Sequence, residues 1–171
     1  MQRVGRLVAI ILTCLVLVAA SVYANGNVWW ESLSQTQRDM YIANEAWREN
    51  GQNGGECKVW VQNLVKYVSL THVMLPQNMS PPNDFYWQSD PYGHAFGMSI
   101  PIENVTIGQI VQMKFRSTGT PHTAIVVGKD ANGVGFLASN DPLGSYTVRY
   151  RYWTFSAFKT AVSGYTVYSV R

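Results

Sequence analysis

The feature that most constrains the fold is a change of hydrophobic period near residue 108. Before it, apolar residues recur at spacings of three and four, as in amphipathic helices. After it, short apolar or alternating runs are separated by turn residues, as in β-strands. Helices followed by a series of strands predict an α+β fold, with N-terminal helices packed on an antiparallel sheet of about five strands.

Two helices are expected in the first half of the chain. Ser34 and Gln37 have the spacing of a capping box and open a helix that runs to about Arg48. A Gly- and Asn-rich loop follows at 50–55, and a second helix is expected from near Glu56 to about Thr71. The second helix has an apolar stripe at spacings of 4, 3, 1 and 3, made by Cys57, Val61, Leu64, Val65 and Val68.

Residues 74–107 are expected to be irregular, because five prolines interrupt them. A loop of this length in a compact domain usually has a function. Its aromatic residues could stack on a sugar or line a peptide groove, and packing of the loop onto the sheet is the alternative. The candidate groove residues are Tyr86, Trp87 and Tyr92.

Five strands are expected after this segment, at 109–115, 122–127, 133–139, 146–152 and 165–170. A turn at 130–133 separates the second strand from the third. Thr154 is placed to cap a short helix that runs through Ala161, before the last strand.

The N-terminus has the layout of a secretory signal peptide. An apolar run from Leu7 to Ala20 follows two arginines and precedes Val22-Tyr23-Ala24, a cleavage site with small residues. The run is about 14 residues, shorter than the ~20 that a spanning helix needs. We therefore expect residues 1–24 to be removed. The domain at 25–171 is then secreted or periplasmic and has no stable membrane association; a membrane anchor is the alternative.

Composition narrows the function classes further. Two of the 13 Lys and Arg residues lie in the first 24, which leaves 11 against 10 Asp and Glu, a formal charge of +1. Because no run of like charges remains, we expect no nucleic-acid partner. Cys57 is then the single cysteine, so it has no internal disulfide partner. A lone thiol in an oxidising compartment is either buried or used.

Cys57 stands at the predicted start of the second helix, directly after a Gly-Gly-Glu sequence. The unpaired N–H groups and the dipole of a helix start favour a thiolate. The N–H of Cys57 would also point to where an oxyanion forms. In the alternative interpretation, the thiol simply begins the apolar stripe of the helix and belongs to the core.

His122 begins an apolar strand, and Pro121 before it suits a strand's first position better than its interior. An imidazole there can take the thiol proton and return it to a leaving amine. Asn140 ends the next predicted strand, which returns beside His122 through the intervening turn. Its side-chain carbonyl is a candidate to hold the imidazole tautomer, with Asp141 as the alternative; this segment also fits an ordinary turn.

Together these segments resemble the papain-like cell-wall hydrolases of the CHAP and NlpC-like groups. The resemblance implies a papain-like fold, with Cys57 as the nucleophile, His122 as the general base and Asn140 as the orienting residue. It also implies hydrolysis of amide bonds, commonly in peptidoglycan stem peptides or cross-bridges. The resemblance covers about Met40 to Arg171 and is carried by Gly55–Val61, Ile107–Val111, His122–Gly128 and Ser139-Asn140.

The sequence departs from papain itself at the second oxyanion donor. Papain has a Gln six residues before its Cys, and Gly51 stands at that position here. Gln52 and Asn53 are the candidate replacements, although spacing alone does not assign either one.

No cofactor and no metal site are expected, because His72 and His94 have no metal-ligand spacing with the other candidate ligands. The function expected is that of a secreted cysteine peptidase or amidase, acting on peptidoglycan or a peptide through a thioester. A non-catalytic wall-binding module and an acyltransferase with the same thiol are the alternatives. An immunity or inhibitor protein is a candidate partner.

Overall fold

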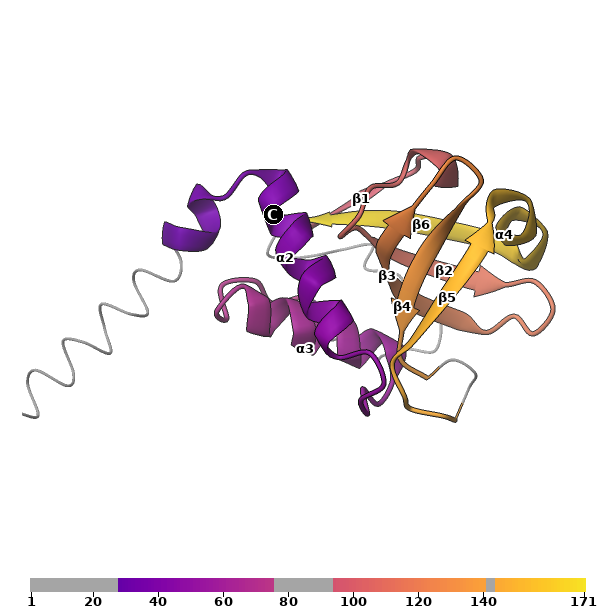
Figure 1. Cartoon of the computed structure of the whole chain (residues 1–171), viewed down its shortest axis with the longest axis horizontal. Helices are drawn as coiled ribbons and strands as arrows, with labels where there is room; N and C mark the ends of the chain where they lie inside the picture. Colours follow the sequence, from indigo (N-terminus) through magenta and orange to yellow (C-terminus); the bar gives the residue numbers. More distant parts are fainter. Residues whose placement is uncertain (1–27, 76–93, 141–143) are drawn as a thin grey trace, which may run out of the picture.

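The computed structural model describes residues 28–75, 94–140 and 144–171 (Figure 1). The predicted signal peptide, the candidate groove residues Tyr86, Trp87 and Tyr92, and the alternative orienting residue Asp141 lie outside the described residues.

Both helices predicted in the first half are present. Helix α2 (Gln35–Arg48) begins with the predicted capping box, in which the Ser34 hydroxyl accepts from the Gln37 N–H and the Gln37 side chain accepts from the Ser34 N–H. Helix α3 (Cys57–Val68) ends three residues earlier than predicted, because Leu70 and Thr71 take φ values of 52° and 68°, outside the helical region. None of the described helices is both long and apolar enough to cross a bilayer.

The strands form one antiparallel six-stranded sheet in the order β1-β6-β2-β3-β4-β5, which confirms the α+β prediction. The five predicted strands correspond to β2 (Ile110–Phe115), β3 (Pro121–Lys129), β4 (Gly133–Ala138), β5 (Arg149–Thr154) and β6 (Val162–Val170). The capped helix before the last strand is α4 (Phe155–Ala161), where Thr154 accepts from the Ala157 N–H.

The sheet has one strand more than predicted, because β1 (Ala95–Met98) lies in the segment that was expected to be irregular. Its four residues include a glycine and do not alternate between polar and apolar side chains. It pairs with the C-terminal strand, with Ala95 opposite Val170. Such a distant partner leaves no local signal in the sequence.

The alternation of β3 divides its side chains between two apolar clusters. Ile125 and Val127 pack with residues of α2 and α3 on one face of the sheet. Ala124 and Val126 pack on the other face, with Phe158 of α4 and with the short 3-10 helix η1 (Ile102–Asn104). Accordingly, α2 and α3 lie together beside the sheet in Figure 1, and α4 lies away from them.

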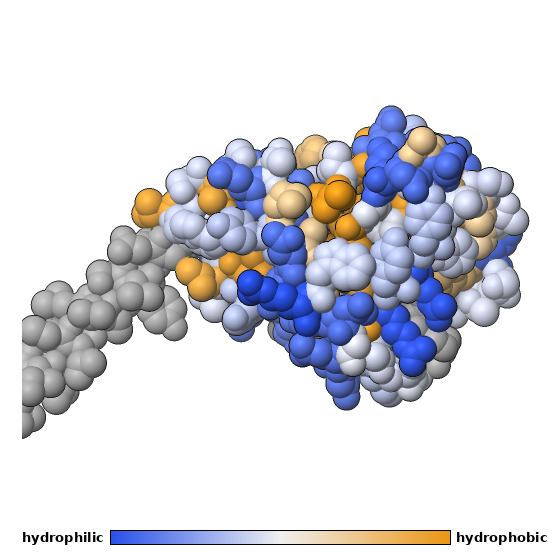
Figure 2. Space-filling model, viewed as in Figure 1, coloured by the Kyte–Doolittle hydropathy of each residue, from blue (hydrophilic) through white to orange (hydrophobic). Residues whose placement is uncertain are grey.

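The molecular surface is mixed in character. On the face shown in Figure 2, hydrophilic residues dominate, and apolar residues gather in small patches near the junction of the helices and the sheet. The two apolar clusters contain the buried core residues, while other large side chains, among them Trp47, Tyr67 and Phe96, stay exposed.

Candidate functional site

A glycine loop places Cys57 at the first position of α3. Gly55 has a φ of 68°, in the left-handed region that glycine adopts without strain. Gly54 lies so close to the end of β4 that an added Cβ would stand 2.7 Å from the Ser139 hydroxyl and 2.8 Å from the Trp60 ring. The Ser139 hydroxyl donates to the Gly55 carbonyl at 2.6 Å. The loop is therefore pressed onto the sheet, and this fixes where the helix starts.

The thiol of Cys57 lies where β3 and β4 separate. The paired stretch of these strands ends at Ile125 opposite Leu137. Just beyond it, the backbone of Thr123 hydrogen-bonds the Cys57 sulfur, an interaction that favours the thiolate and lowers the thiol pKa. The start of α3 is thus seated against the end of β3.

Burial dominates the titration of this thiol. Cys57 is 7% exposed, and desolvation raises its pKa above the ordinary value, although hydrogen bonds from the backbone of Thr123 and Lys58 act in the opposite direction. The neighbouring Glu56 carboxylate raises the pKa further. The sequence had predicted a lowered pKa at a helix start; in the folded chain, the loss of solvent outweighs that effect.

His122 is brought to the same end of the sheet. It is one residue from Thr123, and consecutive Cα atoms are about 3.8 Å apart. The imidazole is 7% exposed. His122 is two residues from Ala124 on β3, so both side chains lie on the sheet face away from α3. There the ring centroid of His122 is 5.7 Å from that of Phe115. The thiol and the imidazole therefore approach the end of β3 from different sides.

Asn140 is buried beside the start of α3, with a φ of 58° that asparagine tolerates better than most residues. Its amide nitrogen donates to the Glu56 carboxylate at 2.8 Å, and its amide oxygen accepts from the Gly144 N–H. The side chain thus joins the residue before Cys57 to the turn after β4. These contacts are with Glu56 and Gly144, and the role that the sequence predicts for Asn140 in orienting His122 stays a prediction.

Gln52 and Asn53 lie in the loop that carries the thiol. Gln52 donates from its side-chain amide to the Arg48 carbonyl at 2.9 Å, at the end of α2. The Asn53 side-chain oxygen accepts from the Gly55 N–H at 3.1 Å. These contacts stabilise the loop, and a role of either amide at an oxyanion stays a prediction.

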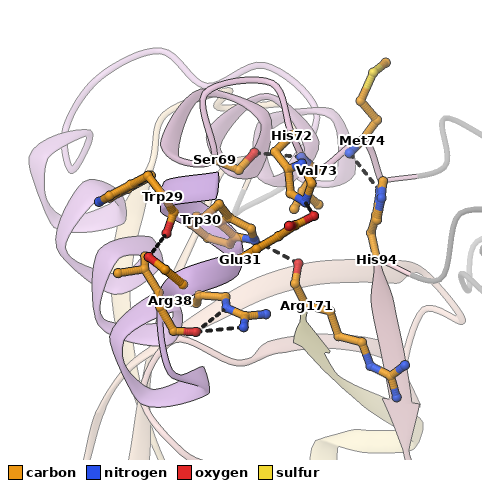
Figure 3. Close-up of polar contacts among 12 residues, drawn as sticks. Trp29, Trp30, Glu31, Arg38, Ser69, His72, Val73, Met74, His94 and Arg171 are labelled. Carbon is orange, nitrogen blue, oxygen red and sulfur yellow. Dashed lines mark hydrogen bonds and ion pairs between the residues drawn. The ribbon is translucent and has the colours of Figure 1, made fainter. Parts of the chain in front are cut away.

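The two remaining histidines belong to a separate polar cluster (Figure 3). His72 faces Glu31 at 3.5 Å, and its ring centroid is 6.0 Å from that of His94, whose Nδ1 accepts from the Met74 N–H. Within the described ranges, no group of three or more His, Cys, Asp or Glu side chains is arranged to hold a metal ion.

Sequence reasoning missed a buried polar pair behind the thiol. Gln112 and Thr123 are fully buried opposite each other on β2 and β3, and the Gln112 amide donates to the Thr123 hydroxyl at 3.3 Å. The sequence did hold one sign of this pair: Gln112 is a polar residue between the apolar residues Val111 and Met113 of β2. It marks the place where the helix-facing side of the sheet turns polar beside Cys57.

A family model described as "Putative amidase domain" matches residues 14–164. No match was found among curated proteins. The crystal structure of Ly7917 is similar, with a TM-score of 0.55 and 16% identity over 77% of this chain and 62% of that chain. The crystal structure of Ly7917 "with the hydrolyzing product of MDP" gives 0.56 and 15% over 77% and 63%. The chain therefore spans less than two thirds of the length of Ly7917.

Proposed function

The chain belongs to this amidase-domain family, and on that premise we propose that it is a secreted thiol hydrolase of papain-like fold that cleaves amide bonds in peptidoglycan peptides. The observation that carries the proposal is the position of Cys57. It is the first residue of α3, and its sulfur lies against the backbone of Thr123, the residue next to His122. The substrate class is supported by the similar structure solved with a product of MDP.

The reaction proceeds through two acyl transfers. Because the imidazole lies on the sheet face away from α3, the proposal requires His122 to turn toward the thiol at the end of β3. There it takes the Cys57 proton as the thiolate attacks the amide carbonyl, and N–H groups at the start of α3 stabilise the oxyanion. The C–N bond then breaks, the imidazolium gives its proton to the leaving amine, and a thioester remains. Water, deprotonated by His122, attacks the thioester and releases a carboxylic acid and the thiol.

The buried thiol determines when the thiolate forms. Because burial raises the pKa of Cys57, a standing thiolate is disfavoured at neutral pH. Proton transfer to His122 is therefore coupled to attack on the bound substrate. In this scheme Asn140 positions the start of α3 through Glu56, and the orienting role that the papain-like resemblance implies for it stays a prediction.

A second candidate function is a non-catalytic wall-binding module on the same scaffold. The burial of Cys57 and the direction of its pKa shift favour it, since both make the thiol less reactive. The two candidates differ in one outcome: a binding module leaves every amide bond of its ligand intact.

The deciding experiment replaces the nucleophile. Peptidoglycan digests are incubated with the wild-type protein and with Cys57→Ala, and new amines and carboxylates are identified by mass spectrometry. We expect Cys57→Ala to lose about a thousandfold or more of the turnover while keeping its fold by circular dichroism. Turnover near the wild-type rate in Cys57→Ala would exclude the thiol mechanism, and binding without cleavage by the wild type would favour the second candidate.

A further inference from the structure

An open cleft lies between α2 and the C-terminal end of β3. Its volume is about 460 Å³, within the range of roughly 300–1,000 Å³ that small-molecule sites occupy. Helix α2 contributes Thr36, Asp39 and Met40 to its lining, and the end of β3 contributes Lys129, followed by Asp130. The cleft is therefore large enough for a ligand of the size of a sugar ring.

An aromatic row, made of Trp47, Tyr150 and Tyr152, adjoins this cleft. Trp47 of α2 stacks on Tyr150 of β5, with ring centroids 5.2 Å apart and ring planes inclined at 25°. Tyr152 is two residues further along β5, so it lies on the same face of the sheet as Tyr150. Its hydroxyl donates to the Asp130 carboxylate at 2.8 Å. Because Asp130 also lines the cleft, the aromatic row and the cleft are continuous.

Packing against the sheet covers only part of each tyrosine ring. Tyr150 lies across Gly135, where an added Cβ would stand 2.6 Å from the ring, and Tyr152 lies across Gly133, where the distance would be 2.7 Å. Even so, Tyr150 and Tyr152 are 41% and 44% exposed, and Trp47 is 42% exposed. The aromatic row thus rests on the sheet at one side and offers ring surface to solvent at the other.

The chemistry of the cleft and of the aromatic row indicates the kind of ligand. The face of an aromatic ring is partly negative, and it attracts the weakly positive C–H groups on the flat faces of a pyranose. Apart from Asp39, which is buried, the charged residues of the cleft are Lys129 and Asp130. Their opposite charges suit neutral hydroxyl groups, which both donate and accept hydrogen bonds. The apolar side chains of Met40 and Ile107 in the lining suit the methyl of an N-acetyl group.

The cleft and the thiol lie on the same side of the sheet but at opposite ends of β3. Thr123 contacts Cys57, and Lys129 is six residues further along the strand, about 20 Å away at the rise of a β-strand. Tyr150 is opposite Leu137, which belongs to the apolar cluster on the helix side. A ligand on this surface therefore leaves the thiol open to a peptide.

We propose that the cleft and the aromatic row together bind a strand of β-linked, N-acetylated amino sugars, the glycan to which the substrate peptides are attached. Sugar rings stack on Trp47, Tyr150 and Tyr152, and an N-acetyl group enters the cleft. This binding holds the domain on the polymer while Cys57 acts on a peptide. The link to the substrate rests on the proposed function, whereas the binding itself needs no chemistry at the thiol.

The test is calorimetric titration with chitotetraose, a β-linked tetramer of N-acetylglucosamine without peptide, and with cellotetraose, which lacks the N-acetyl groups. The wild type and Cys57→Ala should bind chitotetraose equally, and more tightly than cellotetraose. Trp47→Ala and Tyr150→Ala should each weaken this binding about threefold to tenfold, the contribution of one aromatic contact. Tyr150→Phe keeps the ring and should stay within about twofold of the wild type. Tyr67→Ala, which removes an exposed tyrosine of α3, is the matched control and should change nothing.

The absence of chitotetraose binding by the wild type would overturn the proposal, and so would equal affinity for cellotetraose. An equal loss in Tyr67→Ala would overturn it as well, because it indicates unspecific contact with exposed rings. Circular dichroism checks the fold of each variant, and Trp47→Ala decides the outcome if Tyr150→Ala does not fold. The two proposals fail separately: a protein that cleaves no peptidoglycan but binds chitotetraose with the expected pattern of losses supports the glycan site without the thiol chemistry.

Discussion

At the scale of single residues, the reactivity of Cys57 depends on its immediate neighbours more than on its place in a helix. The backbone of Thr123 and the carboxylate of Glu56 act on the thiol pKa in opposite directions, and burial exceeds both. Of these influences, the charge of Glu56 is the one that a conservative substitution removes. Gln in its place still offers an oxygen to the Asn140 amide.

Glu56→Gln should therefore lower the pKa of Cys57, because it removes a negative charge that disfavours the thiolate. The rate of alkylation by iodoacetamide is measured against pH. In the wild type, the midpoint should lie above the ordinary thiol value, since burial raises the pKa, and in Glu56→Gln it should move to lower pH. Glu45→Gln, a change on α2, is the control. An unchanged midpoint in Glu56→Gln would show that the carboxylate does not act on the thiol.

At the scale of elements, local sequence signals predicted most of the fold. The capping box gave the start of α2, and the alternating runs gave five of the six strands. The end of α3 was missed, because nothing in the sequence requires Leu70 and Thr71 to take positive φ values. Strand β1 was missed because its stability comes from pairing with β6, about 70 residues away.

The contact of the thiol-bearing loop with β4 also belongs to this scale, and Gly54 tests it. Gly54→Ala should lower the free energy of unfolding by about 1–3 kcal/mol, because the new methyl group overlaps Ser139 and Trp60. Urea denaturation measures the change. The control is Gly164→Ala in β6, where an added Cβ meets nothing within 4 Å. If the two substitutions changed the free energy of unfolding equally, the close contact of the loop with Ser139 and Trp60 would be contradicted.

At the scale of the whole molecule, the candidate site was predicted in part. Proline before His122 correctly placed the histidine at the end of a strand, and the glycine loop correctly placed Cys57 at a helix start. The sheet face of each side chain and the partner of Asn140 depend on the packing of α3 against β3. That packing joins segments more than 50 residues apart in the sequence, so no local pattern could supply it.

Packing of α2 against the rest of the molecule gives the protein a pH-dependent stability. Asp39 is buried on α2, and this burial raises its pKa from 3.8 to about 6. Between pH 3.8 and about pH 6, Asp39 in the folded protein therefore keeps a proton that it has lost in the unfolded chain. Stability from this group rises as the pH falls from 6 to 4, and the ionised carboxylate costs about 1–3 kcal/mol above pH 6.

Asp39→Asn should consequently raise the free energy of unfolding by about 1–3 kcal/mol at pH 8 and change it little at pH 4. Asparagine keeps an oxygen for the hydrogen bond from Gln35. Urea denaturation at both pH values checks this, with Glu45→Gln as the control. A gain of the same size at pH 4 and pH 8 would rule out ionisation as the cause.

The position of β6 has a consequence for how the protein is made. Strand β6 lies between β1 and β2 although it follows β5 in the chain, so β1 and β2 cannot belong to one sheet until residues 162–170 have been synthesised. Because domains fold as units once their chain is available, a nascent chain that still lacks β6 has no complete sheet on which to assemble the site.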